Sequence, residues 1–489
     1  MKINYNLTLD EILNCTGGKT VIAGDGTGPF VFNEIFTDSR EDFSRNALFI
    51  AIKGKNFNGE DFVDSAFQRG ARCAVVSWDF LEKFGLSKYS DKIIIAVENT
   101  VDALGNISKV YLNRFNLKKK IAITGSCGKT MTKEMSCHII SSKYGAEKIL
   151  KNNYNYNNLI GVPKTILGLN AEHEYLILEI GTNKKGEIKK LSGIIEPDAG
   201  AIVNIGKSHL QEFINPEGVF EEKNELALSL KKDSYLIINA DDEILSEKYE
   251  KIPDANMLSF GLGFKQTGRA ADILCEKIDT DAESGAANIG ISFKGKKYAA
   301  KVRFRGVHLI YDLLCALLVA YVCGIDAETG LKAMEDFVFP EGRMEVISGP
   351  SIGYILINDA YNSNPDSLKA ALDFIKAHYS GKKKILVLGD MLELGDSSEA
   401  EHYNAGRNIA GYADFVFYKG DYAESFRKGL LEEGFPPDKL FPLKDKNTFR
   451  ENFEKLDKKN SVVLIKGSRG NRLEEYFDEE MGCKKTILC

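Results

Sequence analysis

The sequence predicts an α/β protein of three domains: a small α/β domain, a central domain with a mainly parallel sheet, and a C-terminal Rossmann-like domain. Three observations support this fold class. The length of 489 residues corresponds to about three domains at roughly 150 residues each. Short apolar runs alternate with helix-like stretches, as in parallel sheets covered on both faces. A glycine-bearing turn joins a strand-like run to a helix-like run near residue 125.

Composition and charge exclude several classes of function. Hydrophobic residues make up 44% and charged residues 27% of the chain, which is typical of a soluble globular protein. The 64 basic and 70 acidic residues give a net charge of −6, which argues against a general nucleic-acid binder. No apolar run reaches the roughly 20 residues of a membrane span, and the first residues do not resemble a secretory signal. Nine cysteines without a CxxC pair indicate reduced thiols in a cytoplasm.

The first block, residues 1–114, is expected to form the small domain. Its apolar runs ALFIAI and CAVVSW are short and are separated by Gly and Asp turns. This spacing predicts strands that alternate with short helices.

The second block, residues 115–337, is expected to form the central domain. Ile121–Thr124, Tyr175–Ile180 and Ala199–Ile205 are apolar runs that predict buried parallel strands, and a helix is predicted over Lys129–Ile140.

The third block, residues 338–489, repeats the strand and helix alternation in GYILIND, KKILVLGD and SVVLIKGS. Asn364 is a candidate N-cap for a helix, and the proline that follows it suits the first helical position. This block is expected to be Rossmann-like, although its glycine turns do not form the GxGxxG fingerprint of dinucleotide binding.

The strongest single signal is the turn between the predicted strand at 121–124 and the predicted helix at 129–140. Backbone N–H groups in such a turn converge on an anion, and the helix N-terminus adds a favourable dipole. Lys129 is expected to neutralise the terminal phosphates of a nucleotide, and the Thr130 hydroxyl to ligate Mg²⁺. The alternative is an ordinary Gly-rich turn. The predicted phosphate loop consists of Thr124, Gly125, Ser126, Cys127, Gly128, Lys129 and Thr130.

Three details refine this prediction. Ile123 stands where the full P-loop has its first glycine, so the loop is a shortened variant. The string 183–186 lacks the Asp of the guanine-specific NKxD element, so ATP is favoured. Cys127 lies at a helix N-terminus, a position that lowers the pKa of a thiol and raises its reactivity. We nevertheless expect Cys127 to be an incidental occupant and not a nucleophile.

Two residues that follow predicted strands are candidate Mg²⁺ ligands. Glu179 closes an apolar strand, and acids at the carboxyl ends of parallel strands lie where open sheets bind ligands. The alternative is a strand-end acid that faces water. His209 follows the next strand, and a lone histidine of this kind is either a metal ligand or a structural residue.

Lys223 lies on the apolar face of a predicted helix, three or four positions from Val219, Phe220, Leu226 and Ala227. The amine either snorkels to water or serves a site. A buried neutral amine can react with CO₂ to form a carbamate, which acts like an additional carboxylate. Periodicity alone favours the snorkelling alternative.

Four residues of the third block are further candidates. Arg343 is placed to stabilise charge on a transferring phosphoryl group, and Asp359 ends a strand near it in sequence. Lys466 and Ser468 belong to a glycine-bearing turn that suits an anion or a carboxylate. For all four, the competing interpretation is an ordinary surface charge or ion pair.

With these residues in place, the chain resembles the Mur ligases of peptidoglycan synthesis, and most of all the branch that adds D-alanyl-D-alanine. In the first block TDSR, LFIAIKG and FNGEDFVDSAFQRGA are similar to the UDP-binding domain of that family. In the second block TGSCGKTMTKEM, LEIGTNKKGEI and PDAGAIVNIGKSHLQEF follow its ATPase domain in order. In the third block PEGRMEVI, NDAYNSNPDSLKAAL, LVLGDMLELGDSSEAEH and VLIKGSRGNRLEE follow its C-terminal domain.

The resemblance implies roles for individual residues. Lys223 matches the carbamylated lysine of the family, Glu179 and His209 match its Mg²⁺ positions, and Arg343 and Asp359 match positions that domain closure brings to the nucleotide. The substrate-binding positions it implies are Ser39, Arg40, Asn58 and Gly59 for the uridine diphosphate end, and Asn157, Asn158, Lys466 and Ser468 elsewhere.

Two motifs depart from the family pattern. The NxxNALAA motif, which helps to hold adenine, has Leu309 and Asp312 at its two Asn positions, and Asp312 is retained as a predicted nucleotide contact. The motif GNxNNEIG, read at 154–161, lacks a Gly and the Glu. Adenine and acceptor binding are therefore the steps at which this chain is expected to differ.

The implied activity is ATP-dependent amide formation between the carboxylate of a UDP-MurNAc-tripeptide and D-alanyl-D-alanine, through an acyl phosphate. ATP, Mg²⁺ and a carbamate on Lys223 are the implied cofactors, and the enzyme is expected to be a cytoplasmic monomer. The alternatives are a related ligase with another acceptor, or a catalytically weak homologue that binds a UDP-sugar.

Overall fold

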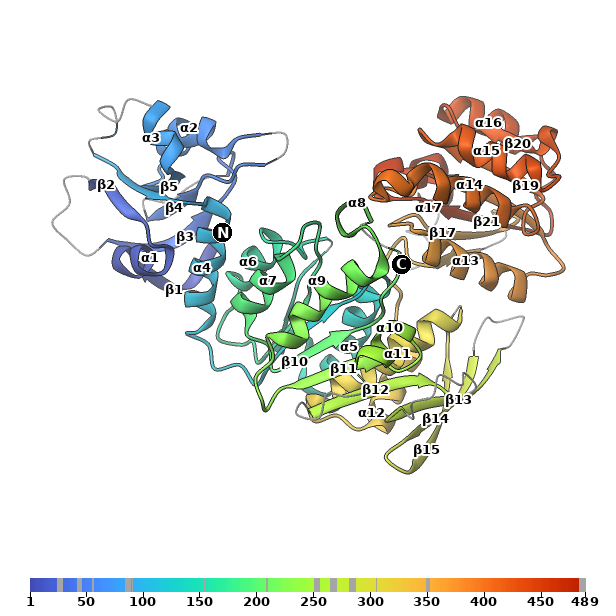
Figure 1. Ribbon diagram of the computed structural model, residues 1–489, viewed down its shortest axis with the longest axis horizontal. Coiled ribbons are helices and arrows are strands. Elements are labelled where there is room, and N and C mark those ends of the chain that lie inside the picture. Colours follow the sequence, from blue (N-terminus) through green and yellow to red (C-terminus); the bar gives the residue numbers. More distant parts are fainter. Residues whose placement is uncertain are drawn as a thin grey trace.

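Three domains, each built on its own sheet, make up the computed structural model. It describes residues 1–23, 30–41, 46–54, 57–83, 89, 91–153, 155–207, 210–249, 256–263, 271–280, 287–304, 306–348 and 352–482. Within these ranges the sheets have six, nine and six strands. Figure 1 shows that the N-terminal domain (blue) and the C-terminal domain (orange to red) both adjoin the central domain (green to yellow). The predicted fold class is confirmed, while the boundaries at 114/115 and 337/338 stay a prediction.

The N-terminal sheet has the order β1-β3-β4-β5-β6-β2, with β3 to β6 parallel and the two edge strands antiparallel. Its strands are β1 (Lys2–Thr8), β2 (Lys19–Ala23), β3 (Val31–Phe36), β4 (Ala47–Ile50), β5 (Cys73–Ser77) and β6 (Ile93–Val97). Its helices are α1 (Leu9–Thr16), α2 (Val63–Gln68), α3 (Trp78–Lys83) and α4 (Thr100–Leu112), with a 3-10 turn at η1 (Gly59–Phe62).

The central sheet has the order β15-β14-β13-β12-β11-β10-β7-β9-β8. It is parallel from β8 to β13 and ends in antiparallel hairpins. Its strands are β7 (Lys119–Thr124), β8 (Ile149–Lys151), β9 (Tyr175–Glu179), β10 (Ala199–Ile202), β11 (Tyr235–Asn239), β12 (Asn256–Leu262), β13 (Ile273–Thr280), β14 (Ala287–Phe293) and β15 (Lys296–Val302).

The helices of the central domain cover both faces of the parallel part of this sheet, which explains why β9 and β10 are buried along their whole length. α5 and α11 pack on one face, and α6, α7 and α9 on the other. The helices are α5 (Lys129–Tyr144), α6 (Gly161–Ile166), α7 (Glu187–Ile195), α8 (Leu210–Phe213), α9 (Pro216–Leu228), α10 (Glu243–Lys248), α11 (Val307–Val322) and α12 (Ala327–Ala333).

The C-terminal sheet has the order β16-β17-β21-β18-β19-β20, parallel except for β16. Its strands are β16 (Glu345–Ile347), β17 (Ile355–Asp359), β18 (Lys383–Gly389), β19 (Phe415–Lys419), β20 (Leu440–Pro442) and β21 (Ser461–Lys466). Its helices are α13 (Pro365–His378), α14 (Ser398–Ile409), α15 (Ala423–Glu432), α16 (Lys446–Glu454) and α17 (Asp478–Gly482). Asn364 caps α13 by accepting a hydrogen bond from the Ser367 N–H at 2.8 Å, as predicted.

The two interdomain junctions differ in chemistry. α4 joins the N-terminal domain to α6 and α7 in one continuous apolar cluster that includes Leu104, Ile107 and Ile194, and the Tyr111 hydroxyl donates to the Leu169 carbonyl at 2.8 Å. Between the central and C-terminal domains, the central hydrophobic cluster extends only as far as Phe339, and among the described residues no such cluster joins the cores of the two domains. Polar contacts join those two domains instead.

The strand predicted over Ala199–Ile205 ends at Ile202. Beyond Ile202 the chain still runs beside β7 and the phosphate loop: the Val203 N–H donates to the Thr124 carbonyl at 2.9 Å, and the Ser126 N–H donates to the Asn204 carbonyl at 3.1 Å. The helix predicted to end at Ile140 continues to Tyr144. In the part of the chain that the structure describes, none of the helices combines the length and apolar character that crossing a bilayer requires.

Candidate active site

Most of the predicted site residues line one cavity of about 870 Å³ between the central and C-terminal domains. The carboxyl ends of β7 and β9 approach it from one side, and those of β17 and β21 from the other. The predicted residues among its lining are Ser126, Cys127, Gly128, Lys129, Thr130, Asn157, Asn158, Glu179, Asp312, Arg343, Asp359, Lys466 and Ser468.

The phosphate loop links β7 to α5 and is held from its own domain. Gly128 has a φ of +79°, and a Cβ there would lie 2.1 Å from the Asp312 carboxylate, so glycine is required twice over. The Cys127 N–H donates to the Asn204 side-chain oxygen at 2.8 Å, and the Lys129 ammonium donates to the Gly125 carbonyl at 2.7 Å. The loop is therefore preorganised, with Lys129 folded over it.

Burial raises the pKa of the Cys127 thiol, so the predicted lowering of this pKa is wrong. Desolvation disfavours the thiolate, and it outweighs the dipole of α5. The Asn364 amide, from the C-terminal domain, lies 3.1 Å from the sulfur. The thiol thus takes part in a domain contact, and the prediction that it is no nucleophile stays a prediction.

Glu179 and Thr130 form the candidate Mg²⁺ site. Glu179 is 3% exposed, so the alternative that it faces water is wrong. Its carboxylate accepts hydrogen bonds from the Thr130 hydroxyl at 2.6 Å and from the Asn157 amide at 2.8 Å. Asn152, 1% exposed, pairs with the Glu179 backbone through both its amide atoms at 2.8 and 3.0 Å.

These oxygen donors fit Mg²⁺, which takes one or two protein ligands together with phosphate oxygens and water. Within the described ranges no three His, Cys, Asp or Glu side chains gather into a metal-binding group. His209, the other predicted ligand, lies outside the described residues.

Lys223 is buried in α9 with 1% exposure, so the snorkelling alternative is wrong. Burial, followed by the positive charge of Lys129, lowers the pKa of its ammonium from 10.5 to about 7. A large fraction of the amine is therefore neutral at pH 7, which is the form that reacts with CO₂.

The C-terminal domain delivers two cations to the cavity. The Arg343 guanidinium donates to the Thr130 hydroxyl at 2.8 Å and lies over the Tyr361 ring, 4.2 Å from its centre. Lys466, 2% exposed, forms an ion pair with Asp359 at 2.5 Å. The alternative of ordinary surface ion pairs is wrong for both, because Arg343 contacts the phosphate loop of the other domain and Lys466 is buried.

The two departures from the family's adenine motif lie in α11. Leu309 and Asp312 are 2% and 4% exposed. Burial raises the pKa of Asp312 to about 8, and the Thr132 hydroxyl lies 3.4 Å from its carboxyl oxygen. A carboxyl group that is neutral at pH 7 has a hydroxyl donor and a carbonyl acceptor, as an Asn amide has an N–H donor and a carbonyl acceptor.

The remaining predicted residues hold local structure. The Asn158 side chain accepts from the N–H of Gly161, the first residue of α6, at 2.9 Å, and the Ser468 hydroxyl accepts from the Leu392 N–H at 2.9 Å. The four UDP-end residues do not line the cavity. They follow β3 and β4, which are parallel neighbours whose carboxyl ends share one edge. They are Ser39, Arg40, Asn58 and Gly59.

Sequence reasoning missed several residues of this site. Asn152 orients Glu179, Tyr361 lies beneath Arg343, and His308 lines the cavity with its pKa lowered by burial to about 4. Asn152 follows the strand-like run Ile149–Lys151, so the argument applied to Glu179 would have found it. His308 and Tyr361 depend on contacts between distant segments.

These features define a class: a nucleotide-binding enzyme in which a phosphate loop on a parallel sheet faces cations from a separate C-terminal domain. Comparisons with known proteins agree with this class. A profile of the Mur ligase family catalytic domain matches residues 32–111, one of the Mur ligase middle domain matches 123–320, and one of the Mur ligase glutamate ligase domain matches 342–469.

Similar proteins cover nearly the whole chain. The UDP-N-acetylmuramoyl-tripeptide--D-alanyl-D-alanine ligase of Bacillus subtilis is 33% identical over 92% of this chain and 93% of its own. A MurF crystal structure from Acinetobacter baumannii has a TM-score of 0.84 and 27% identity, with 99% of this chain and 100% of that chain covered. MurF ligase of Thermotoga maritima in complex with ADP has a TM-score of 0.77 and 25% identity, covering 92% and 98%. The chain belongs to the Mur ligase family.

Proposed function

We propose that this protein is an ATP-dependent ligase that joins the tripeptide carboxylate of a UDP-MurNAc-tripeptide to the amine of D-alanyl-D-alanine, releasing ADP and phosphate. The observation that carries the proposal is the single cavity in which Lys129 and Thr130 of the phosphate loop face Arg343 and Lys466. The ligases to which the chain is similar along more than 90% of their length support the choice of substrates.

The chemistry begins with transfer of the γ-phosphoryl group of ATP to the substrate carboxylate. A carboxylate is a poor electrophile, and the acyl phosphate formed has a good leaving group. The amine of the dipeptide then attacks, and the tetrahedral intermediate expels phosphate. Both reactants of the first step are anionic, so Lys129, the loop N–H groups and Arg343 offset the repulsion as the phosphoryl group moves.

Thr130 and Glu179 would hold Mg²⁺, which when bound supplies charge neutralisation at the phosphate oxygens. The hydrogen bond between these two side chains shows that their oxygens already converge. Asn157 donates to the Glu179 carboxylate, and Asn152 fixes the backbone of the same residue. Closure of the C-terminal domain excludes water, which would otherwise hydrolyse the acyl phosphate.

Lys223 is proposed to carry a carbamate. Its burial and its pKa of about 7 give it the neutral, nucleophilic amine that CO₂ requires. Lys223→Ala should lose turnover and regain part of it with added formate or acetate, because a small carboxylate can occupy the vacated space. Lys129→Ala serves as the control that carboxylates do not rescue. Turnover of Lys223→Ala at the native rate without any carboxylate would contradict the proposal.

We also propose that the enzyme acts as a monomer in the cytoplasm. The seven cysteines that the structure describes are free thiols, which suits a reducing compartment.

The test of the function is ADP release measured with each substrate omitted in turn. We expect release to require ATP, the UDP-linked tripeptide and D-alanyl-D-alanine together, and mass spectrometry to detect the pentapeptide product. A panel of other amino acids, dipeptides and depsipeptides in place of D-alanyl-D-alanine identifies the acceptor. ADP release that is independent of every acceptor, or that prefers another one, would overturn the proposed reaction.

A further inference from the structure

Residues 203–206, which follow β10, contact residues 124–127 at the start of the phosphate loop. The Ser126 N–H donates to the Asn204 carbonyl at 3.1 Å, and the Gly206 N–H donates to the Ser126 hydroxyl at 2.8 Å. The same hydroxyl lies 3.2 Å from the Gly206 carbonyl. Any displacement of residues 204–206 therefore reaches the phosphate loop directly.

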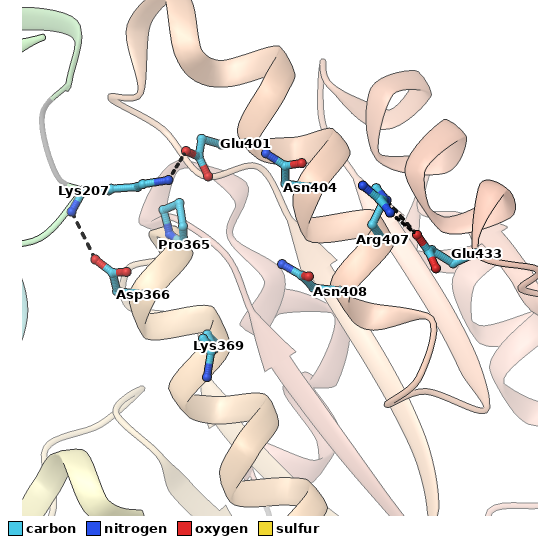
Figure 2. Close-up of a pocket in the computed structure, with 9 residues that line it drawn as sticks. All are labelled: Lys207, Pro365, Asp366, Lys369, Glu401, Asn404, Arg407, Asn408 and Glu433. Carbon is cyan, nitrogen blue, oxygen red and sulfur yellow. Dashed lines mark hydrogen bonds and ion pairs between the residues drawn. The ribbon is translucent and has the colours of Figure 1, made fainter. Parts of the chain in front are cut away.

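The next residue of this loop contacts the C-terminal domain twice. The Lys207 backbone N–H donates to the Asp366 carboxylate at 3.1 Å, in the first turn of α13. The Lys207 ammonium forms an ion pair with Glu401 of α14 at 2.8 Å. Figure 2 shows Lys207 reaching from the central domain to these two helices at the edge of a cleft of about 550 Å³. We call these two contacts the Lys207 bridge.

Lys207 differs from the other cations of this cleft. Lys369 pairs with Asp373 at 2.7 Å within α13, and Arg407 pairs with Glu433 at 2.6 Å within the C-terminal domain. Those two pairs do not cross a domain boundary. Of the three cations that line the cleft, Lys207 is the one whose partners belong to another domain.

The bridge is built at close range. Glu401 retains 13% of its side-chain exposure and Lys207 retains 49%, so the pair is half-buried and solvent screens it in part. A Cβ on Gly206 would lie 2.5 Å from an Asp366 carboxylate oxygen, so glycine leaves room for that side chain beside the loop. The Asn364 amide beside Cys127 continues this contact at the N-cap of α13.

We propose that Lys207 is a positioning residue that couples closure of the C-terminal domain to the geometry of the phosphate loop. Its backbone fixes the start of α13, and its ammonium fixes α14. Both helices belong to the domain that carries Arg343 to Thr130. The kinetic test of this inference rests on the proposed ligase reaction. The structural test depends only on closure of the domain.

The kinetic test uses Lys207→Glu, Glu401→Lys and the double variant. We expect Lys207→Glu to lower kcat by about 10- to 100-fold, the cost of misplacing groups at a distance from the chemistry. The KM for ATP should change less than kcat, because neither the Lys207 nor the Glu401 side chain lines the cavity that contains the phosphate loop. The double variant, which restores opposite charges, should recover most of the lost rate. Lys369→Glu, in the same cleft, is the matched control and should retain native kcat.

The structural test needs no turnover. Small-angle X-ray scattering with a non-hydrolysable ATP analogue should show native protein more compact than Lys207→Glu, with the double variant compact again. Gly206→Ala, which places a methyl group against Asp366, should give the same open form without a change of charge. Native kcat in Lys207→Glu, a double variant no better than Lys207→Glu, or unchanged scattering in folded variants would each overturn the proposal. Circular dichroism establishes folding in every case.

Discussion

Replacing Lys223 with methionine is expected to abolish turnover and, at the same time, to stabilise the central domain. Burial lowers the pKa of this ammonium from 10.5 to about 7. This lowering of the pKa means that burying the charge reduces the free energy of unfolding by about 5 kcal/mol when the group is fully protonated, and by about 4 kcal/mol at pH 7. Methionine keeps a long apolar side chain in the same place without the charge.

The sign of the pH dependence follows from proton binding. The folded state holds the Lys223 proton less tightly than the unfolded state does, so between about pH 7 and 10.5 the unfolded state carries more protons. The free energy of unfolding of the native protein therefore rises with pH across this window. The advantage of Lys223→Met is greatest at and below pH 7 and disappears as the pH approaches 10.5.

The assay must report on the central domain alone. The single tryptophan, Trp78, lies in the N-terminal domain and is unsuitable. Cys137 and Cys315 are buried in the central core, so their alkylation in increasing urea, read by mass spectrometry, follows unfolding of that domain. Solutions are kept free of CO₂ so that the amine stays unmodified.

Lys133→Met is the matched control. Lys133 is as buried as Lys223, but its ammonium donates to the Asn152 carbonyl at 2.5 Å and pairs with Glu134 at 3.0 Å. Removing a satisfied buried cation should destabilise by about 1–3 kcal/mol. If Lys223→Met also destabilises the domain at pH 7, or its effect is the same at pH 6 and pH 10, the reasoning about its charge is refuted.

Three further predictions concern the cavity. Lys129→Ala should remove ADP release but leave the affinity for the UDP-linked substrate, measured by calorimetry, unchanged. Lys143→Ala, in the same helix, is the control and should stay active. Full activity of Lys129→Ala would contradict the phosphate-loop assignment. Arg343→Ala, which loses its hydrogen bond to Thr130, should lower kcat by about 100-fold in steady-state kinetics; an effect on KM alone would argue against a role in phosphoryl transfer. Because burial raises the pKa of Asp312 from 3.8 to about 8, the folded state binds that proton more tightly and ionisation costs stability between these values. The free energy of unfolding in urea should therefore be higher for Asp312→Asn than for the native protein, by an amount that grows from pH 4 to pH 8 and reaches about 4 kcal/mol at pH 7. A difference that does not depend on pH would exclude this explanation.

Local chemistry made much of the architecture predictable. The apolar runs that end at Thr124, Glu179 and Asp359 form the strands β7, β9 and β17, because a strand buried on both faces must be apolar throughout. Parallel strands present their carboxyl ends at one edge, so Glu179 could be expected near the phosphate loop. The hydrogen bond from the Thr130 hydroxyl of the phosphate loop to the Glu179 carboxylate agrees with that argument.

The predictions failed where distant segments decide the environment. The pKa of the Cys127 thiol was predicted from its place before α5, whereas burial, with Asn364 of another domain against the sulfur, determines it. Lys207 showed no pattern in the sequence, because its partners Asp366 and Glu401 are 159 and 194 positions away. Periodicity identified the face of α9 that carries Lys223, but the depth of its burial depends on the helices and strands packed around it.

The contrast between the two junctions has a thermodynamic consequence. Swinging the C-terminal domain away separates hydrogen-bonding groups such as Arg343 and Thr130 and hydrates few carbon atoms. Heat-capacity changes arise mainly from hydrating apolar surface, so this motion should carry almost none. Separating the N-terminal domain from the apolar cluster around α4 would produce a large heat-capacity change. Calorimetry would thus distinguish the junction that is proposed to open and close during catalysis from the junction that separates only on unfolding.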